Sequence, residues 1–300
     1  MKKKTYLFAL MAMVLTLGSC SDNENGIGGE TSKYITVSTS IGNMTRVATD
    51  ANGGQTFEEG DEISVYAWIG APTVAPETSE RVVNNAINKL TNGSWVSTPQ
   101  MLWKNNRDKH YFIGVYPTAA ISDLSAGEYT FDANKQTESD LLVAVNPDGL
   151  SYSADAQQTV PLTFTHVMAK LAVNLTYKNQ WGGIPTVEKV VVGNAAKEAT
   201  INYLTKVVTP STTAKEDFSL PEITENTKYV SVIIPQEDVK QLTIVIGGKN
   251  FVYDNGTPFK LESGKITTVN LEVGRDEIKL GDVKITNWED GSTFSGEALN

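Results

Sequence analysis

Apolar and polar residues alternate with a period of two in several short segments of the chain after residue 33. The clearest examples are residues 35–41, 63–69 and 171–177, where most alternate positions are aliphatic or aromatic. Such alternation is typical of half-buried β-strands. Shorter apolar runs predict further strands at residues 111–116, 141–145, 187–192, 229–234, 242–246, 251–253, 266–273 and 278–288.

Turn-forming residues separate these segments. Clusters such as residues 52–54, 147–149 and 254–256 are rich in Gly, Asn and Asp, which adopt a positive φ at low cost in tight turns. Many short strands between such turns predict an all-β fold built from β-sandwiches. One segment departs from this pattern, because the apolar positions of residues 79–90 lie near one face of a helix and predict one short helix.

The strand-rich sequence divides into two blocks. Small and polar residues between Ser151 and Pro161 separate them. A chain of 300 residues is long enough for two domains at roughly 150 residues each. We therefore expect an N-terminal β-sandwich domain over residues 34–157 and a C-terminal one over residues 158–300.

The N-terminus has the features of an export signal. Three lysines at residues 2–4 precede an apolar run over residues 6–17, which is too short for a comfortable membrane span. Residues 17–20, Leu-Gly-Ser-Cys, resemble a bacterial lipobox, so we expect residues 1–19 to be removed as a signal peptide and Cys20 to be acylated. The alternative is a plain signal peptide followed by an incidental Cys.

The segment after the signal peptide and the charge of the chain add to this picture. Residues 20–33 are rich in Gly, Asn and acidic side chains, which predicts a flexible tether carrying the lipid. The formal net charge is −10, and loss of the three signal-peptide lysines makes it −13. Such an acidic chain is a poor ligand for phosphate backbones, so we expect no nucleic acid among its partners.

The composition also argues against an enzyme. Two His and a single Cys nearly exclude zinc clusters, Cys/His proteases and a disulfide framework. We expect no metal, no cofactor and no catalytic residue. The two features that could support catalysis are His166 and the acidic residues at positions 58–62, and we interpret them as a hydrogen-bonded structural side chain and a solvated strand edge.

Arg46 stands between small residues, after the strand predicted at residues 35–41. An exposed arginine in a linker is a suitable site for a trypsin-like protease. The residues alone favour an ordinary surface arginine.

These features together resemble those of the fimbrillins of the Bacteroidales, the type V pilins. The resemblance rests on short motifs spread in order over most of the chain: the lipobox at Cys20, Thr45-Arg46, Phe57, Gly60-Asp61, residues 63–67, 112–117 and 140–144, Leu162, Phe164, His166, residues 170–171, 264–266 and 285–288. It implies two tandem transthyretin-like β-sandwich domains after a lipoprotein signal peptide, and a structural subunit of an adhesive cell-surface fimbria.

The resemblance also implies how the subunit is processed and assembled. A lipoprotein precursor reaches the surface of the outer membrane, and an arginine-specific protease cuts between Arg46 and Val47. The cut releases the first strand, within residues 34–46, and a C-terminal extension of another subunit, here residues 277–300, fills the groove by β-strand addition.

The candidate residues of the donated strand that would enter the groove are Ile278, Leu280, Val283 and Ile285. Their period-two phase slips between Leu280 and Val283, so the strand needs a bulge there or uses one pair only.

A cleavable arginine together with a strand-forming C-terminus favours a stalk subunit, whose partners are other fimbrial subunits and, through the lipid of the precursor, the outer membrane. A host or bacterial surface receptor is a further expected partner. The alternative function is a non-polymerising surface lipoprotein that binds a glycan or a host protein through its loops and Trp residues.

Overall fold

The structure is a computed structural model that describes residues 33–42, 56–153 and 158–288. In these ranges nearly all regular structure is β-strand, which confirms the predicted all-β class. The two short 3-10 helices are η1 (Thr78–Glu80) and η2 (Asn179–Trp181). The strands are β1 (Thr36–Ile41), β2 (Glu62–Ile69), β3 (Val83–Thr91), β4 (Ser94–Thr98), β5 (His110–Tyr116), β6 (Gly127–Thr130), β7 (Leu142–Leu150), β8 (Thr159–His166), β9 (Ala169–Tyr177), β10 (Val187–Ala196), β11 (Glu198–Asn202), β12 (Val207–Pro210), β13 (Lys215–Ser219), β14 (Glu222–Thr224), β15 (Lys228–Ile233), β16 (Gln241–Ile246), β17 (Lys249–Asp254), β18 (Lys265–Val273) and β19 (Ile278–Asn287).

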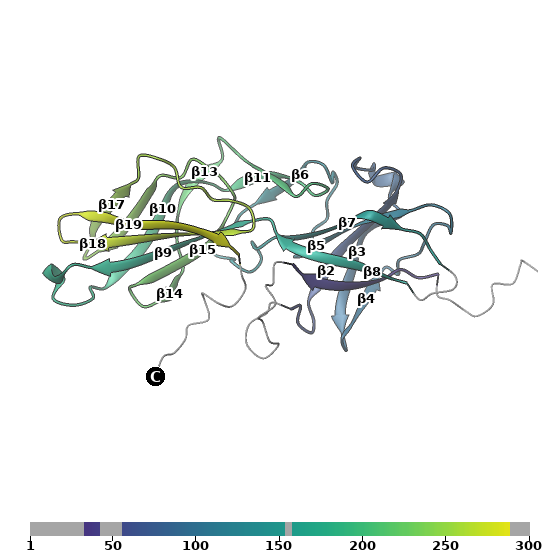
Figure 1. Ribbon diagram of the computed structural model, residues 1–300, viewed down its shortest axis with the longest axis horizontal. Helices are drawn as coiled ribbons and strands as arrows, with labels where there is room; N and C mark the ends of the chain where they lie inside the picture. The colour runs from purple at the N-terminus through teal and green to yellow at the C-terminus, as the bar shows by residue number, and fades with distance from the viewer. Residues whose placement is uncertain (1–32, 43–55, 154–157, 289–300) are drawn as a thin grey trace, which may run out of the picture.

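The strands form two lobes that lie side by side along the long axis of the molecule (Figure 1). The first lobe contains a seven-stranded sheet in the order β1-β8-β7-β5-β2-β3-β4. In the second lobe a four-stranded sheet, β13-β10-β16-β17, packs against a five-stranded sheet, β14-β15-β9-β18-β19. A three-stranded sheet, β12-β11-β6, pairs a strand from the first half of the chain with two strands from the second half. Backbone hydrogen bonds therefore link the two lobes.

The change from one lobe to the other comes after β8. This strand pairs with β1 and β7 in the first sheet. The domain boundary predicted between residues 157 and 158 would place it in the C-terminal domain. The chain passes into the five-stranded sheet between His166 and Ala169. The crossover between the sheets therefore comes after residue 166, beyond the polar segment at residues 151–161.

The predicted helix at residues 79–90 is wrong. Only a single 3-10 turn forms at η1, and Val83–Thr91 is strand β3, paired with β2 and β4. The β2–β3 register shifts between Val65 and Ala67, and Asn85 in this stretch has φ 56°. The irregularity places Val83 and Ala86 on the buried side at a spacing of three residues, which imitates the period of a helix.

Two apolar clusters stabilise the fold. The larger one extends from the inner face of the second lobe to side chains of the first lobe such as Tyr66 and Trp68. The smaller one lies within the first lobe and includes Ile35 and Val37 from the first segment of the described chain. Within the described ranges, no helix is long and apolar enough to cross a membrane.

Candidate functional site: the two terminal edge strands

The first strand, β1, lies at an edge of the seven-stranded sheet and runs parallel to β8. Its residues at odd positions face the core, as the alternation of residues 35–41 predicts. Val37 is opposite Val160, and Ile41 is opposite Phe164. Ile35 and Val37 are 2 % and 6 % exposed, so this strand forms part of the smaller core.

On its other side β1 contacts the opposite end of the same sheet. The N–H of Ile35 donates to the carbonyl of Met101 (2.9 Å), and the N–H of Trp103 donates to the carbonyl of Lys33 (3.2 Å). The indole N–H of Trp95, on β4, donates to the hydroxyl oxygen of Thr39 (3.0 Å). The sheet is therefore strongly curved, and β1 lies between β8 on one side and β4 with the segment after it on the other.

Two hollows meet at the C-terminal end of β1. One, of about 730 Å³, runs alongside the strand and is bordered by Trp95. The other, of about 650 Å³, lies between the lobes and is lined by Tyr116, Ile223 and Val230 among others. Both hollows share Ile41 and Phe57 in their walls.

One polar side chain of the hollow between the lobes, that of Tyr116, is hydrogen-bonded. Burial raises the pKa of Tyr116, and the charge of Asp61 raises it further. The hydroxyl therefore remains protonated and donates to a carboxylate oxygen of Asp61 at 3.3 Å.

The predicted processing site lies just beyond β1. Cys20, Arg46 and Val47 fall outside the described residues, which end at Gly42 and resume at Thr56. Two other arginines of the first lobe can be compared with Arg46. Arg81 is 8 % exposed and donates to the carbonyls of residues 121 and 122, so it is shielded from a protease. Arg107 is exposed, in a short turn before β5.

The last strand, β19, lies at the edge of the five-stranded sheet and pairs antiparallel with β18. The register shifts at Gly281, so β19 has a bulge on its own subunit at the position where the period-two phase slips. Because of this bulge, the four candidate residues of the donated strand all stand opposite residues of β18 that face the core. The pairs are Ile278 with Val273, Leu280 with Leu271, Val283 with Val269, and Ile285 with Thr267.

This apolar row is only partly covered. Leu280, Val283 and Ile285 are 38 %, 38 % and 36 % exposed, whereas their partners on β18 are at most 1 % exposed. The opposite face of β19 is polar, with two lysines, an aspartate and a threonine. An edge strand with a half-exposed apolar row has both unpaired backbone groups and apolar surface available for another chain.

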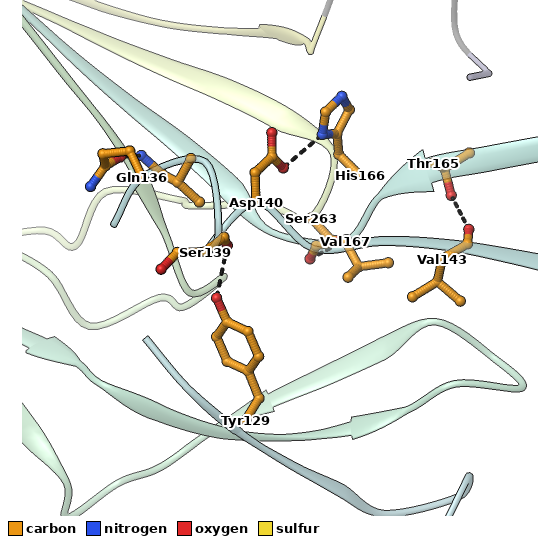
Figure 2. A network of polar contacts seen from close by, with 10 residues as sticks. Tyr129, Gln136, Ser139, Asp140, Val143, Thr165, His166, Val167 and Ser263 are labelled. Carbon is orange, nitrogen blue, oxygen red and sulfur yellow. Dashed lines mark hydrogen bonds and ion pairs between the residues drawn. The ribbon is translucent and has the colours of Figure 1, made fainter. Parts of the chain in front are cut away.

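The end of β19 is anchored where the two lobes meet. The indole of Trp288 is 2 % exposed and stacks on the imidazole of His166, with ring centroids 4.0 Å apart and an interplanar angle of 8°. The ammonium of Lys170 lies 4.0 Å from the centroid of the indole ring. Figure 2 shows Asp140 directed at the imidazole, whose Nδ1 lies 2.8 Å from the carboxylate, and Tyr129 bonded to Ser139 of the same loop.

The environment of His166 agrees with one prediction from the sequence and contains one contact that the sequence did not predict. His166 is a hydrogen-bonded structural side chain, as expected from its lack of a catalytic partner. Sequence reasoning missed its stacking on Trp288, because the two residues are far apart in the chain and no local pattern connects them. Three of the five Trp residues are buried, and Trp95 and Trp181 are partly exposed and engaged in hydrogen bonds.

Most of the chain, from the residues after β1 to the end of β19, matches a known protein family. The model of the fimbrillin-like family matches residues 45–288. The chain belongs to the fimbrillin-like family. No curated protein sequence matches it.

Solved structures share the fold of this family member. A provisionally assigned cell adhesion protein from Bacteroides uniformis is similar with a TM-score of 0.63 at 18 % identity, over 85 % of this chain and 98 % of the other. A similarly assigned protein from Bacteroides ovatus gives 0.62 at 17 % identity, over 85 % and 98 %. A fimbrial protein from Bacteroides vulgatus gives 0.52 at 14 % identity, over 85 % and 99 %.

Membership of the fimbrillin-like family supports a role as a fimbrial subunit located at the cell surface and associated with other fimbrial subunits. It also identifies the chain as a structural protein and not an enzyme.

Proposed function

We propose that this fimbrillin-like protein is a stalk subunit that polymerises by β-strand exchange after a proteolytic cut between Arg46 and Val47. The cut separates β1 from the rest of the first lobe, and the released strand leaves an acceptor groove. The C-terminal strand β19 of a neighbouring subunit then occupies this groove.

Loss of β1 leaves a strongly unsatisfied edge. The strand β8 pairs with β7 at only three positions, from Phe164 to His166, while β1 pairs with it from Thr159 to Phe164. Residues 159–163 of β8 therefore lose the only strand partner that they have among the described residues when β1 departs. Buried backbone groups without hydrogen bonds are costly, so the vacated groove favours any complementary strand.

The single observation that carries the proposal is the match between the two edge strands. β1 presents four residues to the core, namely Ile35, Val37, Thr39 and Ile41. β19 also presents four residues on one face, because the bulge at Gly281 brings its two apolar pairs into line. Each strand has a polar opposite face. β-strand addition requires this combination of backbone pairing and alternate apolar side chains.

The geometry also favours an open chain of subunits. The acceptor edge lies in the first lobe and the donor strand in the second, so each contact joins two different surfaces. Such a heterologous contact does not have to close into a ring and can extend into a filament.

The precursor in this proposal is a lipoprotein acylated at Cys20 and held at the outer membrane. A cut after Arg46 also removes the lipid, so a polymerised subunit is held by its neighbours alone. A receptor on a host or bacterial surface would be bound by the assembled fibre.

The test compares Arg46→Ala with Arg107→Ala in the full-length chain, expressed in a bacterium that has an arginine-specific surface protease. We expect the Arg46 variant to remain an uncut, lipid-bearing monomer. The Arg107 variant, which removes an exposed arginine from the same lobe, should be cut and polymerise normally. Polymer formation by the Arg46 variant at the normal level contradicts the proposal.

A further inference from the structure

The burial of the C-terminal segment on its own subunit differs sharply between β19 and the residue that follows it. Every residue of β19 except Ile278 is classed as exposed, and its outer edge has no strand partner among the described residues. The next residue, Trp288, is 2 % exposed. The ladder to β18 and this one buried side chain therefore provide most of the attachment of residues 278–288.

The pocket that holds Trp288 contains groups from both sides of the crossover between the lobes. His166 is the last residue of β8, and Lys170 lies at the start of β9. The imidazole stacks flat on the indole, and the ammonium makes a cation–π contact with it. The backbone N–H of Trp288 donates to the carbonyl of Gly264 at 3.0 Å. Asp140 fixes the imidazole through its Nδ1 atom.

The attachment is also incomplete. The indole Nε1 of Trp288 is buried without a hydrogen-bond partner in the described part of the chain. A buried donor without an acceptor weakens the docked state relative to one in which the indole reaches water or another acceptor. The indole therefore packs closely against its neighbours, but its N–H group lacks a hydrogen bond among the described residues.

We propose that Trp288 is a latch that keeps the donor strand β19 on its own subunit until an acceptor groove is available. This inference rests on the proposed function and adds a point of control to it. Withdrawing β19 for donation requires the indole to leave His166 and Lys170. The latch thus sets how readily a subunit offers its strand and limits pairing with wrong edges before the acceptor groove has opened.

The inference predicts a local effect in the monomer. In an Arg46→Ala background, which prevents the cut, Trp288→Ala should raise the hydrogen-exchange rates of the amides of β19 by about tenfold or more. The amides of β9 and β15, in the middle of the same sheet, should exchange at unchanged rates. The matched control is Trp95→Ala, which removes a partly buried Trp from the first lobe and should leave β19 exchange unchanged.

Two conservative variants separate a latch from a general loss of structure. Trp288→Phe and His166→Phe keep a flat ring on each side of the stack, so both should restore slow exchange in large part. His166→Ala should behave like Trp288→Ala. Equal exchange of β19 in the original chain and in Trp288→Ala overturns the latch, as does a rise that includes β9 and β15 to the same degree.

A second measurement distinguishes failure of the latch from failure of the proposed function. In the cleavable chain, Trp288→Ala should increase the initial rate of polymerisation after the cut. Faster β19 exchange without faster polymerisation means that β19 is not the donor, and it overturns both the donor assignment and the regulatory role of Trp288. Unchanged exchange overturns the latch alone, whatever the polymer does.

Discussion

Charges placed on the apolar face of β19 should block polymerisation, because this face is partly exposed in the isolated subunit and is expected to be fully covered in an acceptor groove. The double variant Leu280→Asp with Ile285→Asp changes one residue on each side of the bulge, and both lie in the row that faces the core. In the isolated subunit these residues are 38 % and 36 % exposed. In an acceptor groove both are expected to be covered.

The size of the effect follows from these exposures. A fully buried Leu or Ile side chain contributes about 2 kcal/mol, so the partly covered row loses about 3 kcal/mol for the two changes in the isolated subunit. In the groove the loss is about 4 kcal/mol, and each unpaired buried carboxylate adds at least about 1 kcal/mol. The difference of about 3 kcal/mol corresponds to roughly a hundredfold weaker strand donation.

The matched control is Lys284→Asp, which alters the net charge by the same amount but lies on the polar face of β19, opposite Thr268. Polymer length after protease treatment can be read from a gel ladder and from electron micrographs. We expect monomers and short oligomers for the double variant and normal ladders for the control. Ladders of normal length from the double variant refute the assignment of β19 as the donor.

Three further predictions concern the bulge, a buried imidazole and a buried guanidinium. Deleting Gly281 removes the extra residue of the bulge and leaves all four apolar residues of β19 in strict alternation on one face, so polymers should keep their normal length; ladders as short as those of the double Asp variant contradict this. Burial lowers the pKa of His110, whose Nε2 accepts a hydrogen bond from the N–H of Lys104. The contribution of His110 to the free energy of unfolding should therefore be constant above about pH 6.5 and fall as the pH drops below it. Urea denaturation of His110→Gln should show a weaker dependence of the unfolding free energy on pH, and an equal dependence argues against this cause. Arg81→Ala removes hydrogen bonds to two backbone carbonyls and should cost about 2–4 kcal/mol, whereas Arg107→Ala should stay within about 0.5 kcal/mol; equal melting temperatures would show that the buried guanidinium contributes little.

The sequence supports the local features of the fold well. The alternation at residues 35–41 predicts both the strand β1 and the face that it buries, because period two is a direct consequence of strand geometry. The phase slip after Leu280 indicates either a bulge or the use of one apolar pair, and on its own subunit β19 has a bulge at Gly281. Where a bulge lies inside a strand without such a clue, as at Asn85 in β3, the same reasoning predicts a helix instead.

The non-local features could not be derived from local patterns. The pairing of β6 with β11 joins a strand from the first half of the chain to one from the second half. The polar residues at 151–161 indicate a domain boundary before β8, but β8 belongs to the sheet of the first lobe. The stack of Trp288 on His166 is of the same kind, since each residue alone is typical of an ordinary buried side chain. Tertiary packing, and not periodicity, brings these residues together.

The most direct test of the central claim is the N-terminus and intact mass of the subunit in fibres isolated from the bacterial surface. The proposed strand exchange requires a chain that begins at Val47 and has no lipid. We therefore expect a single N-terminus at Val47 throughout the polymer. Fibres made of chains that begin at an acylated Cys20, with β1 still attached, would contradict assembly by strand exchange.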